Sequence, residues 1–227
     1  MTQTALIVGA SRGIGLGLVR ELTRRGWEVT GTARSAEGEK ALKAVDGKVR
    51  VETVDTADRA SAEALRQRLD GQVFDLIIVN AGIGGPRDKN PRTVSDEEFS
   101  HLFITNSLAP VRLAELLAKQ VRPQTGVIGL MTSQLGSVEQ ASAGGMELYR
   151  ASKAALNSFT RSFAARHKDK GFATLSLHPG WVKTDMGGPG AAIDVETSAR
   201  GLIDVVERAQ KDRQDRYVDY KGDALPW

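Results

Sequence analysis

The sequence predicts an α/β fold: one Rossmann-like, doubly wound parallel sheet of about seven strands with helices on both faces. Short apolar runs alternate with longer amphipathic segments along the chain. The run at residues 74–79 is apolar almost throughout, which is typical of a parallel strand covered on both faces. A glycine-rich turn joins the first run to the first amphipathic segment. Alternation of this kind implies right-handed crossovers between parallel strands.

Each predicted element follows from its pattern of apolar residues. The predicted strands are residues 5–8, 27–33, 49–54, 73–79, 127–131, 173–177 and 217–220. The predicted helices are residues 13–25, 57–69, 96–119, 149–167 and 197–209. Ser95 and Glu98 have the spacing of a capping box, which marks the start of the third of these helices.

Length and composition limit the possible function classes. The 227 residues suit one domain, 1–227. The chain has 31 Lys and Arg against 28 Asp and Glu, and the small surplus is spread along it, so we expect no nucleic-acid partner. No stretch approaches the ~20 apolar residues of a membrane span, and no targeting signal opens the chain. We therefore expect no membrane partner and a cytoplasmic location, which the absence of cysteine fits. The three histidines are too scattered for a metal site.

The turn Gly9-Ala10-Ser11-Arg12-Gly13-Ile14-Gly15 predicts a phosphate cradle. It follows the first predicted strand directly and opens the first predicted helix. Glycines there allow a tight turn and let main-chain N–H groups approach a pyrophosphate at the positive end of the helix. The spacing differs from the commoner G-x-G-x-x-G, and such glycines can also serve only to pack a helix against a strand. The strand and helix context favours a dinucleotide-binding turn.

Arginines near this turn favour NADP(H) over NAD(H). An NAD-binding protein usually carries an acidic residue about 20 positions after the glycines, where it holds the ribose 2′-hydroxyl. Here the second strand ends on Ala33, and Arg34 follows. A guanidinium can bind a 2′-phosphate through paired hydrogen bonds, whereas a carboxylate would repel it. Arg12 can approach from the other side. The alternative for each arginine is a solvated surface charge.

Tyr149 and Lys153 form a candidate acid–base pair. They are four positions apart, which places them on one face of a helix. An unperturbed tyrosine has a pKa of about 10, and a nearby ammonium is expected to lower the pKa and make the phenol a usable acid or base. A Tyr-x-x-x-Lys pair can also consist of two solvent-exposed side chains with no catalytic role. The context favours the pair, because Ser133 and Asn80-Ala81-Gly82 follow two strands at the carboxyl edge where such sheets bind ligands.

Together these segments resemble the short-chain dehydrogenase/reductase family, over nearly the whole chain. Within the family, the run from Tyr149 to Asn157 and the closing Asp223-Ala224-Leu225-Pro226-Trp227 are most similar to the C-factor and sniffer-type carbonyl reductases. The matching segments are the glycine turn, Asn80-Ala81-Gly82, Asn106-Ser107-Leu108-Ala109-Pro110, Ser133, Tyr149 with Lys153, and His178-Pro179-Gly180.

The resemblance implies four catalytic residues. Tyr149 would give a proton to the substrate oxygen, or take one in the reverse reaction. Lys153 would hold the nicotinamide ribose hydroxyls and lower the tyrosine pKa. Ser133 would hydrogen-bond the substrate oxygen. Asn106 would anchor a water that links Lys153 to bulk solvent, although an asparagine in a helix kink can also serve free main-chain groups.

The resemblance also implies the cofactor contacts. Asp55 would accept from the adenine amino group, with a loop-capping carboxylate as the alternative. Gly180, Val182 and Thr184 would meet the nicotinamide carboxamide. The full predicted set is Gly9, Ser11, Arg12, Gly13, Ile14, Arg34, Asp55, Asn80, Ala81, Gly82, Tyr149, Lys153, Pro179, Gly180, Val182 and Thr184.

Two features depart from the family pattern. Ser133 and Tyr149 are 16 positions apart, somewhat more than usual, and we expect the loop 136–145 to absorb the extra residues beside the substrate site. The segment before the predicted helix at 197–209 is short, and it contains a possible lid at 185–196. A small lid predicts an open pocket and loose substrate selection.

The sequence thus predicts an NADPH-dependent oxidoreductase that reduces a small-molecule aldehyde or ketone to an alcohol, reversibly. One alternative is a cofactor-binding regulatory or signalling protein with little turnover. Another is an epimerase or dehydratase of nucleotide sugars with bound NAD, which the short C-terminal region and Arg34 disfavour. The helices at 96–119 and 149–167 carry alanine- and leucine-rich stripes beyond what one sheet face requires. The family resemblance implies that these helices form an interface between copies, so we expect a homodimer or homotetramer. Phe159 and Phe163 are expected in the core.

Overall fold

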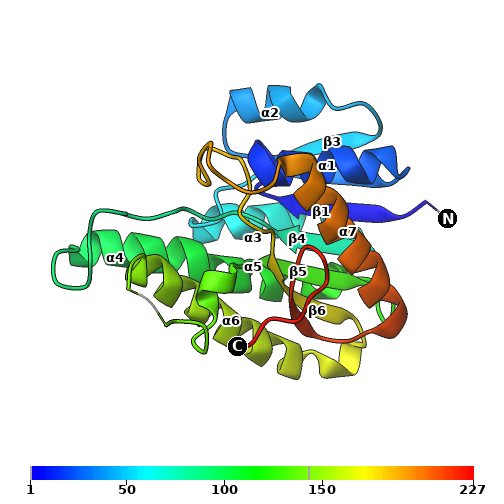
Figure 1. Ribbon diagram of the computed structural model, residues 1–227. Coiled ribbons are helices and arrows are strands. Elements are labelled where there is room, and N and C mark those ends of the chain that lie inside the picture. The colour runs from blue at the N-terminus through cyan, green and yellow to red at the C-terminus, as the bar shows by residue number, and fades with distance from the viewer. Residues whose placement is uncertain (1, 143) are drawn as a thin grey trace.

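The computed structural model of the protein describes residues 2–142 and 144–227. Its centre is a sheet of seven parallel strands in the order β3-β2-β1-β4-β5-β6-β7 (Figure 1). The strands are β1 (Thr4–Val8), β2 (Glu28–Ala33), β3 (Val49–Thr53), β4 (Leu76–Val79), β5 (Val127–Met131), β6 (Ala173–His178) and β7 (Arg216–Asp219). This confirms the predicted fold class.

Helices cover both faces of the sheet (Figure 1). The described helices are α1 (Gly13–Arg24), α2 (Ala36–Lys43), α3 (Arg59–Arg68), α4 (Asp96–Phe103), α5 (Ala109–Leu117), α6 (Glu147–Arg166) and α7 (Val195–Asp212). Successive residues of a strand point to opposite faces, so Ile7 packs with α1, α2 and α7, whereas Leu6 packs with α3, α5 and α6. The central strands β1, β4 and β5 are therefore apolar at nearly every position.

Three predicted elements differ from the structure. The helix expected at 96–119 is divided into α4, a π-helical turn η1 (Ile104–Leu108) and α5. The strand expected at 73–79 begins only at Leu76, because Phe74 makes an isolated bridge to Val121. Residues 195 and 196, which the predicted lid included, already belong to α7. The predicted capping box is confirmed, since Ser95 and Glu98 bind each other's main-chain N–H groups.

The order in which successive strands are added to the sheet reverses between β1 and β4, which are parallel neighbours. From β1 the chain continues outward to β2 and β3, and from β4 it continues outward on the other side. A crevice forms at the carboxyl ends of strands at such a switch point. Gly9 and Asn80 follow β1 and β4 there, and the Asn80 amide donates to the Gly9 oxygen at 2.9 Å. In the described part of the chain, no helix is long and apolar enough to cross a membrane.

Candidate active site

Glycines bring the start of α1 against the end of β1. Gly9 and Gly13 have φ values of +79° and +53°, which favour glycine. A Cβ atom on Gly9 would lie 2.8 Å from the Ala81 nitrogen, and one on Gly15 would overlap the Gly9 oxygen. Arg12, at the N-cap of α1, makes no side-chain capping bond in the described residues. The first N–H groups of α1 thus face the crevice, where a phosphate could accept from them.

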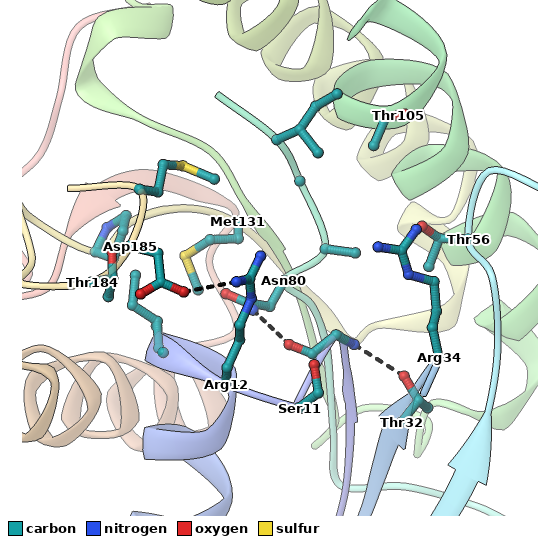
Figure 2. A pocket seen from close by; sticks show the side chains of 18 of the residues that line it. Ser11, Arg12, Thr32, Arg34, Thr56, Asn80, Thr105, Met131, Thr184 and Asp185 are labelled. Atoms are coloured by element: carbon teal, nitrogen blue, oxygen red, sulfur yellow. Dashed lines mark hydrogen bonds and ion pairs between the residues drawn. The ribbon is translucent and has the colours of Figure 1, made fainter. Parts of the chain in front are cut away.

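A cavity of about 490 Å³ extends from the glycine turn to Tyr149 and Lys153. Figure 2 shows Arg34 and Thr56 on one side of this cavity, Thr184 and Asp185 on the opposite side, and Arg12, Asn80 and Met131 between them. The cavity brings together most of the predicted cofactor contacts: Gly9, Ser11, Arg12, Gly13, Ile14, Arg34, Asn80, Ala81, Gly82, Tyr149, Lys153, Pro179 and Thr184. The predicted contacts Asp55, Gly180 and Val182 are not among the residues that line it in the described structure.

Arg34 and Arg12 have different surroundings. The Arg34 side chain is 72% exposed and its guanidinium lies 3.9 Å from the Asp55 carboxylate, a loose pair that leaves most of its donors free. Arg12 donates to Asp185 at 2.7 Å across the crevice (Figure 2). Asp55 also accepts from the Ala57 main-chain N–H at 3.0 Å, which is the loop-capping alternative noted for this carboxylate.

Lys153 is buried on α6. Its Nζ atom donates to the Met131 main-chain oxygen at 2.9 Å and lies 5.9 Å from the centre of the Tyr149 ring. Burial lowers the pKa of Lys153 to about 8, because the interior solvates an ammonium poorly. The helical spacing thus places the two side chains on one face, as predicted.

The expected lowering of the Tyr149 pKa is not found. Burial raises the pKa of the Tyr149 phenol, and the Ser133 side chain and the Arg87 charge offset only part of the rise. The expectation was wrong about the effect of Lys153 in this arrangement: the ammonium faces Met131 rather than the phenol oxygen. Tyr149 is therefore protonated at neutral pH.

Ser133 follows β5 at the carboxyl edge of the sheet. Its hydroxyl accepts from the Leu135 N–H at 3.2 Å and lies near enough to Tyr149 to influence the phenol. Ser133, Tyr149 and Lys153 therefore converge, as the sequence predicted. Ala143, in the predicted loop 136–145, lies outside the described residues.

Asn106 lies in the π-helical turn and is fully buried. Its Oδ1 atom accepts from the Ile83 N–H, and its Nδ2 atom donates to the Ile83 oxygen, both at 2.8 Å. This is the alternative role noted for a helix-kink asparagine. A Cβ atom on Gly82 would lie 3.3 Å from Asn106 Oδ1 and 3.5 Å from Lys153 Nζ, so Gly82 keeps a space open between them.

The segment between β6 and α7 borders the other side of the cavity. Gly180 has a φ of +85°, and Val182 pairs with Ile193 in an isolated bridge that closes the base of the loop. Thr184 accepts from the Gly187 N–H at 3.1 Å. The loop between Thr184 and Asp194 is thus a compact turn, and α7 begins directly after it.

Comparison with known proteins identifies the family. The short chain dehydrogenase model matches residues 3–192. The chain belongs to the short-chain dehydrogenase family. It is 35% identical to the C-signal protein of Myxococcus xanthus over 157 residues, 67% of this chain and 92% of that protein.

Solved structures agree with this family assignment. A carbonyl reductase of Pseudomonas aeruginosa PAO1 in complex with NADP is 40% identical, with a TM-score of 0.90 and 100% of both chains covered. The carbonyl reductase Sniffer of D. melanogaster is 30% identical, with a TM-score of 0.92 and the same coverage. The predicted resemblance to this type of short-chain dehydrogenase is confirmed, and the chain is an oxidoreductase of that family.

Two threonines of this short-chain dehydrogenase were missed in the sequence. Thr105 and Thr132 line the cavity, and their buried hydroxyls have no hydrogen-bond partner among the described residues. Each is adjacent to a predicted catalytic residue, Asn106 or Ser133, and that adjacency was the available signal. Unpaired buried hydroxyls facing a cavity are costly unless a ligand pairs with them.

The cavity fits a dinucleotide. Its glycine turn admits a phosphate, two threonine hydroxyls have no hydrogen-bond partner among the described residues, and Arg34 supplies a guanidinium that is only loosely paired with Asp55. In the described part of the chain, no group of three metal-binding side chains gathers.

Proposed function

We propose that this short-chain dehydrogenase is an NADPH-dependent reductase of aldehydes or ketones that also runs in reverse. The observation that carries the proposal is a cavity lined by Tyr149 and Lys153 and also by the glycine turn and Arg34, with the Ser133 side chain beside the Tyr149 phenol. The similarity to a solved carbonyl reductase in complex with NADP supports it.

Cofactor binding uses three parts of the cavity. The main-chain N–H groups at the start of α1 would donate to the pyrophosphate, and the Arg34 guanidinium would donate charge-assisted hydrogen bonds to the 2′-phosphate. Lys153 holds the ribose hydroxyls, and Thr184 with the neighbouring Gly180 and Val182 contacts the carboxamide. The Asp55 carboxylate, 3.9 Å from the Arg34 guanidinium, would accept from the adenine amino group. Bound NADPH supplies the hydride for the reaction.

Tyr149 is the general acid. Because burial raises the pKa of its phenol, the hydroxyl keeps its proton at neutral pH and gives it to the substrate oxygen as the carbonyl carbon is reduced. The carbonyl would gain a hydride from NADPH and a proton from Tyr149, so the products would be one alcohol, one NADP⁺ and one deprotonated Tyr149. The Ser133 hydroxyl donates to the same oxygen and fixes its distance from the phenol.

Lys153 and Asn106 restore the proton. Lys153 has a pKa near 8 and a short path to the open space beside Gly82, so it can pass a proton toward Tyr149. Asn106 holds the main chain at Ile83 and borders the same space, where a water would connect Lys153 to solvent.

The test is the loss of NADPH absorbance with a panel of aldehydes and ketones, using Tyr149→Phe as the matched variant. Turnover by the natural protein and its loss in Tyr149→Phe, with NADPH binding retained, is the expected result. Equal rates from both proteins would overturn the role of Tyr149.

A signalling role with little turnover is the second candidate function. Its support is the similarity to a protein named C-signal. The same assay decides between the two functions: NADPH binding without turnover of any carbonyl in the panel would favour signalling.

We further propose a cytoplasmic homodimer or homotetramer, with the loop from 185 to the start of α7 as a small lid over a permissive substrate site. Exposed apolar side chains support association through α4, η1 and α6, where Phe99, Ile104, Leu108 and Phe159 are each about two-fifths exposed. Phe163 is fully buried, so the prediction of a core position holds for Phe163 and was wrong for Phe159.

A further inference from the structure

The segment from Tyr217 to Trp227 folds back behind Ser133. We propose that Tyr217 and Trp227 are positioning residues, which hold Ser133 and the loop 134–139 in place and thereby build the rear wall of the catalytic site. The proposal rests on the proposed function only through the role of Ser133. In the sequence, residues 223–227 are notable only for their resemblance to the carbonyl reductases. Their contacts in the structure indicate a role in positioning Ser133.

Tyr217 reaches Ser133 from β7. Its hydroxyl donates to the Ser133 main-chain oxygen at 2.6 Å, and the side chain is buried. The Gly136 N–H donates to the same oxygen at 2.8 Å. Removing the phenol would leave a buried carbonyl with one donor in place of two. Burial raises the pKa of Tyr217 to about 12, so its hydroxyl remains a donor throughout the working pH range.

A tight turn returns the chain from β7 toward Tyr217. The Asp219 carboxylate accepts from the N–H groups of Lys221, Gly222 and Asp223 at 2.8 to 3.0 Å. The Leu225 N–H then donates to the Tyr217 oxygen at 2.9 Å. This fixed path brings the Trp227 ring to 5.1 Å from the Tyr217 ring, a tilted aromatic contact.

Trp227 connects the loop after Ser133 to α6. Its main-chain oxygen accepts from the Glu139 N–H at 3.3 Å and from the Ser137 hydroxyl at 3.5 Å. The Arg161 guanidinium, from α6, lies over the Trp227 ring at 5.0 Å. In Figure 1 the red end of the chain lies beside α6, consistent with this contact.

The same loop also contacts the helix that carries Tyr149 and Lys153. Asn157 Nδ2 donates to the Gly136 oxygen at 3.2 Å, and a Cβ atom on Gly136 would lie 2.8 Å from the Lys153 main-chain carbon. Ser133 and α6 are therefore joined through Gly136 on one side and through Trp227 on the other. These contacts hold Ser133 at a fixed distance from the helix that carries the Tyr149 phenol.

The expected size of the effect follows from geometry. A displacement of about 1 Å between reacting groups can cost up to ~100-fold in rate. Loss of the Tyr217 hydroxyl removes one of the two donors to the Ser133 main-chain oxygen, so we expect kcat to fall about tenfold. NADPH affinity is expected to stay within about twofold of the natural value, because Tyr217 and Trp227 do not line the dinucleotide cavity among the described residues.

The experiment compares Tyr217→Phe, Trp227→Ala and Trp227→Phe with the control Tyr220→Phe. The control also removes a tyrosine hydroxyl, three positions further along the chain. The Tyr220 hydroxyl has no hydrogen-bond partner in the described structure. The measurements are kcat, the KM for a carbonyl substrate, the NADPH dissociation constant by fluorescence titration, and amide hydrogen exchange of residues 134–142.

Support for the proposal is a lower kcat in Tyr217→Phe with NADPH affinity retained, faster exchange of the 134–142 peptide in Trp227→Ala, and recovery of most activity in Trp227→Phe. Natural kcat in Tyr217→Phe together with natural exchange in Trp227→Ala would overturn it. So would a parallel loss of kcat, NADPH affinity and melting temperature, which indicates general destabilisation. If the natural protein reduces no carbonyl, the proposed function fails, and the exchange of the 134–142 peptide alone decides the positioning role.

Discussion

The Lys153 ammonium lies 2.9 Å from the main-chain oxygen of Met131, a strand residue two positions before Ser133. The charge is thus held against the sheet rather than against the Tyr149 phenol. Its burial lowers the pKa of Lys153 to about 8, and this has consequences for stability as well as for proton transfer.

Replacement of Lys153 by methionine is expected to stabilise the cofactor-free protein and abolish its turnover. Lowering a lysine pKa from 10.5 to about 8 costs about 3 kcal/mol of folding free energy when the group is charged. The substitution removes this cost but also removes the hydrogen bond to Met131, which offsets part of the gain in stability. We therefore expect the free energy of unfolding at pH 7 to rise by about 2 kcal/mol. Urea denaturation measures it.

The control is the pH dependence of the difference in unfolding free energy between Lys153→Met and the natural protein. The cost to the natural protein is present in full below pH 8, because the ammonium is then charged in both states. Between pH 8 and 10.5 the folded protein has lost the proton that the unfolded chain still binds, so stability rises with pH and the advantage of Lys153→Met shrinks. A constant difference across this range would contradict burial as the cause.

The pH profile of alcohol oxidation tests the state of Tyr149. Oxidation needs the phenolate, and the phenol pKa is raised, so we expect the oxidation rate to climb about tenfold per pH unit through the neutral range without a plateau below pH ~10. Carbonyl reduction needs the protonated phenol and is expected to show no such climb. A plateau of oxidation near pH 7 would instead indicate the lowered pKa that the sequence predicted.

Local pattern was sufficient to predict the sheet and the edge where the site lies. β4 consists of four consecutive apolar residues, and all four are buried. A short run of this kind predicts a strand that is covered on both faces. The four-residue spacing of Tyr149 and Lys153 likewise fixed their common helical face. These features depend on residues that are close in sequence.

Features set by distant residues could not be predicted in the same way. The π-helical turn at Asn106 adds one residue to a helical turn without disturbing the apolar pattern on either side. The sign of the Tyr149 pKa shift depends on burial by several segments. Phe159 lies at the edge of the buried stripe that ends on Phe163, so its exposure is decided by what covers α6 rather than by its spacing.

The substitution Arg34→Asp tests the cofactor preference. A charge-assisted hydrogen bond contributes about 1.5–3 kcal/mol, so loss of the guanidinium and gain of a repelling carboxylate should weaken NADPH binding at least ~10-fold. NADH affinity should change much less or improve, because it carries no 2′-phosphate. Fluorescence titration with both cofactors measures the ratio.

Arg12→Ala is the matched variant for that experiment. Arg12 is already paired with Asp185 at 2.7 Å, and both side chains are largely exposed, so we expect a smaller loss of NADPH affinity than in Arg34→Asp and little change in stability. If Arg34→Asp leaves NADPH affinity unchanged, Arg34 does not bind the 2′-phosphate.

Association through α6 can be tested at Phe159. Its ring is 41% exposed on a helix that packs beside η1, where Leu108 is 39% exposed, and burial of such side chains between copies would stabilise an oligomer. Phe159→Lys is expected to convert the oligomer to a monomer in light-scattering measurements at micromolar concentration, because the interface cannot solvate the charge. Val73→Lys, at an equally exposed apolar residue before β4, should leave the mass unchanged. A natural protein that is already monomeric, or a Phe159→Lys variant of unaltered mass, would show that copies do not meet through this face.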